Sequence, residues 1–242
     1  MAISTAAPTS ADVIHELSQL GSESIKKVLV KHGAKEPFYG VKVEDLKKIQ
    51  KRVKANQALA LELYDTGISD AMYLAGLIAE PMKFTKPQLN KWVKAAHWYM
   101  LSEFTVPWVT SESPFATELA KQWMASKVET IAASGWATYS SYVAITPDEQ
   151  LDLEEIEGLL STVERTIHQS ANRVRHCMNA FVIAVGSYVP ALTGRAIATA
   201  QAVEKVSVDM GDTACQVPSA VESIAKVQAR GKHGVKRKSA GC

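Results

Sequence analysis

Cysteine is scarce in this chain, and its spacing excludes several kinds of site. The three cysteines, Cys177, Cys215 and Cys242, are odd in number and far apart, with no C-x-x-C spacing. Such a set is typical of free thiols in a reducing compartment, and not of a disulfide framework or a zinc site. We therefore expect a cytoplasmic protein without a structural metal.

Long apolar runs and nucleotide-binding motifs are also missing. The most apolar stretch, residues 180–189, is too short to cross a bilayer. The N-terminal residues lack the charged and apolar regions of a signal peptide. No Walker, dinucleotide-binding, nucleophile-elbow or HExxH motif occurs. We therefore expect no membrane partner and no cofactor.

Candidate strands are nearly absent, because only Val206-Ser207-Val208 alternates briefly. Elsewhere apolar residues recur at helical spacing in segments of about ten to fifteen residues joined by short loops. Thr85, with Pro87 in the first turn, and Thr146 are candidate helix N-caps. The pattern predicts an all-α fold of roughly a dozen helices. We expect a disordered lead at residues 1–9, a single domain at 10–227 and a basic C-terminal tail at 228–242.

The net charge of +2 conceals an uneven distribution. Residues 26–54 are strongly basic, residues 148–164 are acidic, and every charged side chain after Glu222 is positive. This asymmetry favours a polyanionic partner over uniform solvation. The tail is predicted to be flexible, and it either reaches phosphates or only improves solubility.

The segment from Pro37 to Ile49 is the most informative stretch. Gly40 suits a backbone position with positive φ, and a basic amphipathic helix follows it, with cations on one face and apolar residues on the other. On charge alone, a solvated lysine face explains this helix. The aromatic-Gly-Val loop before a basic helix, however, resembles the opening signature of the DNA alkylation repair family, the HEAT-like-repeat alkylpurine DNA glycosylases. That resemblance implies a HEAT-like helical-repeat stack, an α–α superhelix, whose concave surface holds double-stranded DNA.

The aromatic segment from Trp92 to Trp108 carries the second part of the resemblance. A new helix beginning near Trp98 places Tyr99 and Glu103 on one face, four residues apart. In the family an aromatic residue and a carboxylate occupy such a pair beside the lesion, and the following Val106-Pro107 matches the family pattern. The resemblance implies Glu103 as the catalytic carboxylate. It also implies that aromatic side chains face the lesion. The candidates are Trp98, Tyr99 and Phe181, with Trp136 as a residue that could take the place of a missing one.

This chemistry is physically reasonable. An N3- or N7-alkylated purine is cationic and is attracted to aromatic faces, and a carboxylate can stabilise the oxocarbenium-like sugar that remains. Three features depart from the family: glutamate replaces the usual aspartate, the helix at 132–144 lacks the usual arginine, and Phe181 stands where a tryptophan is usual. Alternatively, the aromatic residues only pack, and Glu103 is an exposed helix carboxylate.

A polar segment, residues 168–181, precedes the apolar stretch. A helix beginning near Asn172 would place Asn172, Arg175, His176 and Asn179 on one face, where they suit phosphate and groove contacts. A polar first turn that satisfies its own amides is the alternative. The predicted DNA-binding residues are Lys42, Lys47, Lys51, Arg173, Arg175 and His176.

Taken together, these patterns predict a monomeric DNA-binding alkylation-repair protein that releases N3- or N7-alkylated purines from duplex DNA. Two alternatives stay open. One is a non-catalytic HEAT-like module that binds damaged or branched DNA. The other is a helical-repeat scaffold for protein interactions.

Overall fold

The computed structural model describes residues 8–241, and within that range it contains thirteen α-helices and no strand. The predicted all-α fold is therefore confirmed. Of the expected lead, residues 1–7 lie outside the described residues, as does Cys242. The α-helices are α1 (Ser10–Leu20), α2 (Glu23–Lys31), α3 (Val43–Val53), α4 (Gln57–Asp65), α5 (Ser69–Ile78), α6 (Lys86–Ala95), α7 (Val106–Ser111), α8 (Ala116–Met124), α9 (Glu129–Ile145), α10 (Leu153–Thr166), α11 (Asn172–Tyr188), α12 (Thr193–Val203) and α13 (Ala220–Ala229). Short turns of 3₁₀-helix lie at Pro81–Lys83, Asp148–Gln150, Ile167–Gln169 and Pro190–Leu192, and η2 (Met100–Thr105) is a π-helix.

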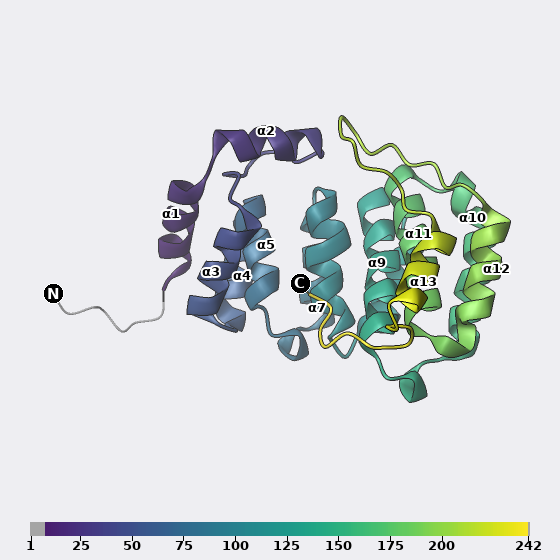
Figure 1. The fold of residues 1–242 in the computed structure, drawn as a ribbon. Helices are drawn as coiled ribbons and strands as arrows, with labels where there is room; N and C mark the ends of the chain where they lie inside the picture. The colour runs from purple at the N-terminus through teal and green to yellow at the C-terminus, as the bar shows by residue number, and fades with distance from the viewer. Residues whose placement is uncertain (1–7, 242) are drawn as a thin grey trace.

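The helices form two layers. Helices α3, α5, α7, α9 and α11 follow one another side by side along the molecule (Figure 1), and the packing of neighbours continues from α5 through η2 to α9 and α11. Helices α4, α8 and α12 pack against α5, α9 and α11 as the second layer. Each helix buries one apolar stripe against its neighbours, as a helical-repeat stack requires.

Two hydrophobic cores fill the space between the layers. The first core joins helices α1 to α8 and includes Trp92, whose ring stacks on Tyr64 with centroids 3.9 Å apart. The second core joins α8 to α13 around Phe181. Within residues 8–241 no single helix has the length and apolar character of a membrane span; Asn172–Tyr188 and Pro190–Val203 meet the criteria only as a pair that bends by 114°.

Local signals in the sequence fix several of these elements. Thr85 forms a capping box with Gln88 at the start of α6, as its position predicts. Gly40 adopts φ +78°, and a Cβ there would lie 2.8 Å from the carbonyl oxygen of Ser22. The loop around it is held by buried Asp70, which accepts hydrogen bonds from the backbone N–H groups of Tyr39 and Val41.

One predicted helix start is wrong by several residues. Thr146 does not cap a helix; it is followed by the 3₁₀ turn Asp148–Gln150. Helix α10 begins at Leu153, where the Asp152 side chain accepts from the backbone N–H of Glu155. At both Thr146 and Asp152 a polar side chain precedes an apolar stripe. With the helix beginning at Leu153, the side chain of Leu151 lies in the second core.

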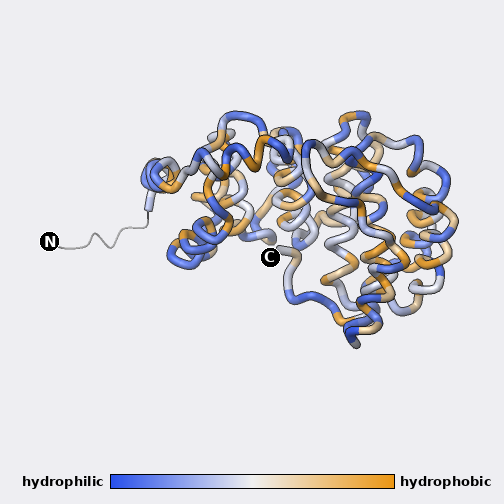
Figure 2. The backbone as a smooth tube through the Cα atoms, turned by 45° about the horizontal axis from the view of Figure 1, so that its top comes forward, coloured by the Kyte–Doolittle hydropathy of each residue, from blue (hydrophilic) through white to orange (hydrophobic). Residues whose placement is uncertain are grey.

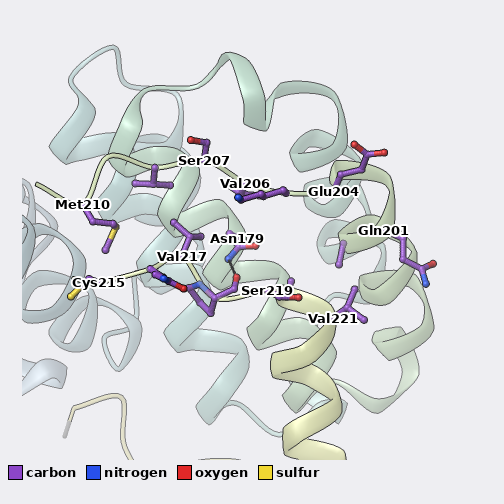
Figure 3. Close-up of a pocket in the computed structure, with 16 residues that line it drawn as sticks. Asn179, Gln201, Glu204, Val206, Ser207, Met210, Cys215, Val217, Ser219 and Val221 are labelled. Carbon is purple, nitrogen blue, oxygen red and sulfur yellow. Dashed lines mark hydrogen bonds between the residues drawn. The ribbon is translucent and has the colours of Figure 1, made fainter. Parts of the chain in front are cut away.

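The long connection between α12 and α13, residues 204–219, arches over one end of α11 (Figure 1). The brief alternation at Val206-Ser207-Val208 forms no strand. Instead Asn179 donates to the carbonyl of Pro218, and a cavity of about 720 Å³ remains beneath the connection (Figure 3). The tip of the connection reaches α2, where Asp212 lies 3.9 Å from the Nζ of Lys31.

The basic C-terminal segment is not the flexible tail that its composition predicts. Helix α13 continues to Ala229, and residues 230–241, here called the strap, then run back across the ends of α11 and α9 to α7 (Figure 1). Backbone N–H groups of the strap donate to carbonyls at the ends of helices, which have no partner within their own helix. These hydrogen bonds and one buried alanine side chain fix the strap.

Candidate functional site

The candidate carboxylate lies in the π-helix that precedes α7. Pro107 cannot donate a hydrogen bond to the carbonyl four residues back, that of Glu103, and its ring clashes there with a regular α-turn. The chain widens into the π-helix Met100–Thr105 at this point, and the hydroxyl of Ser134 donates to the freed carbonyl of Ser102. Val106-Pro107 therefore accounts for the local geometry around Glu103.

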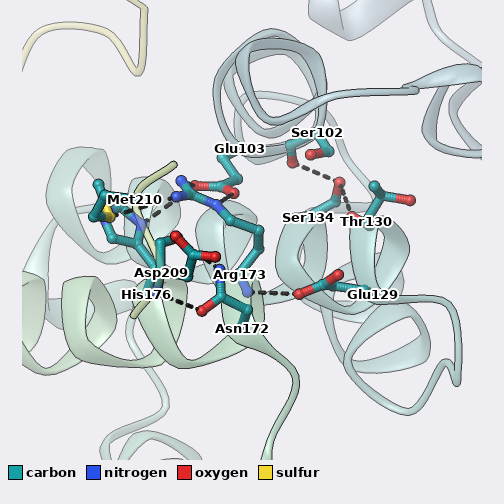
Figure 4. Close-up of polar contacts among 10 residues, drawn as sticks. All are labelled: Ser102, Glu103, Glu129, Thr130, Ser134, Asn172, Arg173, His176, Asp209 and Met210. Atoms are coloured by element: carbon teal, nitrogen blue, oxygen red, sulfur yellow. Dashed lines mark hydrogen bonds and ion pairs between the residues drawn. The ribbon is translucent and has the colours of Figure 1, made fainter. Parts of the chain in front are cut away.

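Glu103 is held in a buried, bidentate ion pair with Arg173 (Figure 4). The Nε and one terminal nitrogen of Arg173 each lie 2.6 Å from a different carboxylate oxygen. The Nδ1 atom of His176 lies 3.2 Å from Oε2 of the same carboxylate. The Glu103 side chain is 3% exposed, so both of its oxygens are occupied by protein groups and almost no solvent reaches them.

These partners decide the charge of the carboxylate. Burial alone would raise the pKa of Glu103, but the hydrogen bonds and charges of His176 and Arg173 outweigh it and hold that pKa below its ordinary value. Glu103 is therefore ionised at neutral pH. The neighbouring Cys177 is affected in the opposite way, because burial raises the pKa of its thiol well above the ordinary value.

Tyr99 covers the outer side of the ion pair. The guanidinium carbon of Arg173 lies 4.8 Å from the centroid of the Tyr99 ring, within the range of a cation–π contact. The predicted placement of Tyr99 and Glu103 on one side of the chain therefore holds, with Arg173 between them. A cavity of about 390 Å³ opens beside this group, and Tyr99, Phe104, His32, Arg173 and residues of the 204–219 connection line it.

The other predicted lesion-facing aromatic residues do not face this cavity. Trp98 is 8% exposed and belongs to the first core. Trp136 and Phe181 pack edge to face in the second core, with centroids 5.4 Å apart, and Phe181 has no exposed surface. The α9–α11 contact encloses Phe181, which contradicts its predicted position facing a lesion. Trp136 is 3% exposed and lines a separate cavity of about 350 Å³ together with Val174 and Met178, so its role stays a prediction.

The predicted DNA-binding residues fall into two separate groups. Lys42 and Lys51 are exposed at α3, and Lys47 is half-buried there. Arg173, Arg175 and His176 lie on α11, which packs with α9, α12 and α13 and not beside α3. The two groups thus lie on helices that do not pack directly against each other.

The α11 group is also less available than the sequence suggests. Arg173 and His176 are engaged with Glu103, and Arg175 donates to the side chain of Asn172. Asn172 in turn exchanges two hydrogen bonds with the backbone of Asp209. A phosphate approaching this end of α11 would have to compete with these contacts.

Glu103, His176 and Cys177 also place one potential metal-ligand atom each within 4.8 Å of one another. The surroundings do not suit a cation. The guanidinium of Arg173 already occupies both carboxylate oxygens, and the raised pKa keeps the thiol of Cys177 protonated. These residues therefore form a structural cluster and not a metal centre.

Sequence reasoning did not foresee the partner of Glu103. The two ion-paired residues are 70 positions apart, and nothing in either local pattern links them. A weaker signal was present: Arg173, His176 and Cys177 follow helical spacing and form a face that is partly polar yet turned inward. Such a face needs a buried counter-charge, and Glu103 provides it.

Comparison with known proteins places this geometry in a family. Residues 13–222 match the family model described as DNA alkylation repair enzyme. The chain is 35% identical over 221 residues to an uncharacterized protein of Listeria innocua, covering 89% of this chain and 95% of the relative. An uncharacterized protein of Listeria monocytogenes is 35% identical over 223 residues, which cover 90% of this chain and 96% of that relative.

A solved structure is also similar to this chain. It has a TM-score of 0.89 and 36% identity, and the match covers 97% of this chain and all of that one. That structure is described as representing a new family of proteins related to the HEAT-like repeat DNA glycosylases with affinity for branched DNA structures. The fold is therefore that of a HEAT-like repeat, and this chain belongs to the DNA alkylation repair enzyme family.

Proposed function

We propose that this protein binds branched DNA and does not excise bases. The observation that carries the proposal is the ion pair of Glu103 with Arg173, in which both oxygens of the candidate catalytic carboxylate are taken. A carboxylate that stabilises an oxocarbenium-like sugar must lie next to that sugar with an oxygen free. Here a guanidinium fills that position, and Tyr99 lies across the guanidinium.

The energetics favour keeping the pair closed. Separating Glu103 from Arg173 would leave a buried charge without a partner, which costs about 3–5 kcal/mol in other proteins. A cationic purine would have to supply that free energy before the carboxylate could help its departure. The same residues therefore serve to hold η2 against α11 at the middle of the stack.

DNA binding itself has independent support. Lys42, at the N-cap of α3, and Lys51 on α3 are exposed and form no ion pair within the part of the chain that the structure describes, so they are free to contact phosphates. Such contacts need no base recognition and make affinity depend on salt. The relative of known structure is described as having affinity for branched DNA structures, and its similarity extends over almost the whole chain.

Excision of alkylated purines is the second candidate. The cavity of about 390 Å³ beside Tyr99 favours it, because an aromatic wall next to an ionised carboxylate suits a cationic base. For this function Arg173 would have to move away from Glu103 when DNA binds. The two functions therefore differ in one property that can be measured, the release of free base.

The test uses three DNA substrates. Two of them, a four-way junction and a linear duplex, have equal phosphate number, and the third is a duplex that contains 7-methylguanine. Binding is followed by fluorescence anisotropy at several salt concentrations, and base release by chromatography. We expect the wild type to bind the junction more tightly and to release no base above the rate without protein. The Glu103→Gln variant, checked for folding by circular dichroism, is the control.

Two results would contradict the proposal. Release of 7-methylguanine by the wild type that disappears in Glu103→Gln would assign the carboxylate to catalysis. Equal affinity for junction and linear duplex would remove the branched substrate and leave a general duplex-binding protein.

A further inference from the structure

The strap, residues 230–241, combines a basic composition with a fixed backbone. It contains five arginine or lysine residues and no aspartate or glutamate. Its Gly234 N–H donates to the carbonyl of Ser187 at the end of α11, and its Arg237 N–H donates to the carbonyl of Ala144 at the end of α9. Further along, the N–H of Ala240 donates to Glu112, and the Ala240 side chain is completely buried in the first core. The strap is therefore anchored at three successive points.

Two polar side chains add to this anchoring. His233 shares a hydrogen bond of 2.7 Å with Thr193 at the start of α12. Lys236 binds the carbonyl of Val143 at 3.0 Å and the carboxylate of Asp148 at 2.8 Å. One of the five cations thus has a structural role, and the others remain.

The remaining cations are exposed. Figure 2 shows the strap as a strongly hydrophilic run just before the C-terminus. Arg230, Lys232, Arg237 and Lys238 are all exposed, and among the described residues none of them forms an ion pair with an acidic side chain. Arg237 donates a hydrogen bond to the carbonyl of Gly241 but has no counter-charge within residues 8–241. An anchored backbone that carries exposed cations without counter-charges holds those charges near one another before any ligand arrives, which lowers the entropic cost of binding an extended anion.

The strap lies far from the residues of the candidate site. Arg173 and Glu129 meet where α11 and α9 begin, whereas Ser187 and Ala144 lie where the same two helices end. Both helices have 17 residues, which corresponds to about 25 Å. The surface proposed above for DNA lies at α3, and the far end of the strap borders that helix, because Gln50 of α3 lines one cavity together with Ser239 and Gly241. From there the strap leads away from α3, past the ends of α9 and α11.

We propose that the strap is a second phosphate-binding surface, which holds another arm of a branched DNA. The inference rests on the proposed function and deepens it. A linear duplex bound at α3 runs in one direction, whereas a junction sends a second arm in another direction, which the strap follows as it leads away from α3. The gain from the second contact is then an effective-concentration effect available only to branched DNA. The strap is thus the part of the protein that favours junctions over linear duplexes.

The experiment compares two triple variants that change the net charge equally. The strap variant carries Lys232→Gln, Arg237→Gln and Lys238→Gln; all three side chains are exposed, so the fold should be unaffected. The control variant carries Lys83→Gln, Lys94→Gln and Arg165→Gln, which are exposed positions outside the strap. Each protein is titrated with a four-way junction and with a linear duplex of equal phosphate number.

We expect the strap variant to lose at least about tenfold in affinity for the junction and about twofold or less for the linear duplex. The slope of log affinity against log salt for the junction should become shallower by up to about 2.7, which corresponds to three phosphate contacts. The control variant should lose equally little on both substrates. An unchanged junction affinity, or an equal loss on both substrates, overturns the role of the strap. A wild type without junction preference overturns the proposed function first, so the two failures are distinguishable.

Discussion

At the scale of single residues, the ion pair of Glu103 and Arg173 is the feature that distinguishes the two candidate functions. The carboxylate is buried, ionised and bound at both oxygens. Its position follows from Pro107, which is four residues further along the chain and prevents a regular α-turn. Glu103 therefore anchors η2 to α11 through Arg173.

Removing the charge of Glu103 should destabilise the protein. In Glu103→Gln the guanidinium of Arg173 stays buried without its counter-charge, and we expect the free energy of unfolding at pH 7 to fall by about 3 kcal/mol. Urea unfolding measures this. Glu62→Gln is the matched control, because Glu62 is exposed on α4, and it should change stability by no more than about 0.5 kcal/mol.

The same pair predicts a pH dependence. Because the pKa of Glu103 is lowered in the folded state, the unfolded carboxyl group takes up a proton first as pH falls. The stabilisation is thus complete above the ordinary glutamate value of about 4.3 and is lost below it, through the lowered pKa. Unfolding free energies at pH 6 and pH 3.5 should differ more for the wild type than for Glu103→Gln. Equal differences for the two proteins would show that Glu103 is not stabilised as an anion.

Residue-level patterns predicted the local geometry well and the long-range contacts poorly. The positive φ of Gly40 and the cap at Thr85 depend on neighbours within a few positions, and both were predictable. The partner of Glu103 lies 70 positions away, and the burial of Phe181 depends on how α9 meets α11. Neither follows from the spacing of side chains along one helix.

At the scale of helices, the close contact of α8 with α9 depends on one glycine. A Cβ at Gly135 would lie 2.6 Å from the carbonyl oxygen of Ala120 and 2.6 Å from the amide nitrogen of Met124. Backbone atoms cannot move aside as a flexible side chain can, so α8 and α9 would have to separate. Gly135→Ala should therefore lower the free energy of unfolding by about 1–3 kcal/mol.

Gly158 provides the control, because it lies in α10 with no atom within 4 Å of its hypothetical Cβ. Gly158→Ala should raise stability by up to about 1 kcal/mol, as expected for alanine in an open helix interior. Thermal unfolding of both variants checks the pair of predictions. A Gly135→Ala protein as stable as Gly158→Ala would mean that α8 and α9 pack less closely than described.

The strap makes a further prediction at this scale. Ala240 is fully buried and its N–H donates to Glu112, so an aspartate there would be buried near a second carboxylate. Ala240→Asp should release the end of the strap and increase the rate of tryptic cleavage after Arg237 or Lys238 by about tenfold, since cleavage follows the open population. Ser239→Asp adds the same charge at an exposed neighbour and should leave the rate unchanged. Similar rates for both variants would contradict the anchoring at Ala240.

At the scale of the whole molecule, the periodicity of apolar residues predicted the fold class, whereas composition misjudged the basic C-terminal segment. Helical periodicity and the lack of strands predict a helical stack, because a helix can bury an apolar stripe only against other helices here. The strap reads as a flexible tail, since it has few apolar residues. It is nevertheless ordered, because helix ends far away in sequence supply the carbonyl groups that its backbone needs.

The whole stack also explains why two cationic surfaces matter more than the total charge. The net charge is only +2, and Arg173, one of the predicted DNA contacts, is neutralised inside the protein. The cations that remain include exposed groups at α3 and along the strap. Such an arrangement favours a ligand that presents phosphates in more than one direction.

The most direct test of the central claim is a competition measurement with the wild-type protein. A labelled four-way junction is bound at fixed salt and then displaced by unlabelled linear duplex or by unlabelled junction of equal phosphate number. If the protein recognises branched DNA, the linear duplex should need at least about tenfold more phosphate to displace half of the label, a difference of about 1.4 kcal/mol. Displacement at equal concentrations of the two competitors would contradict recognition of branched DNA by this protein.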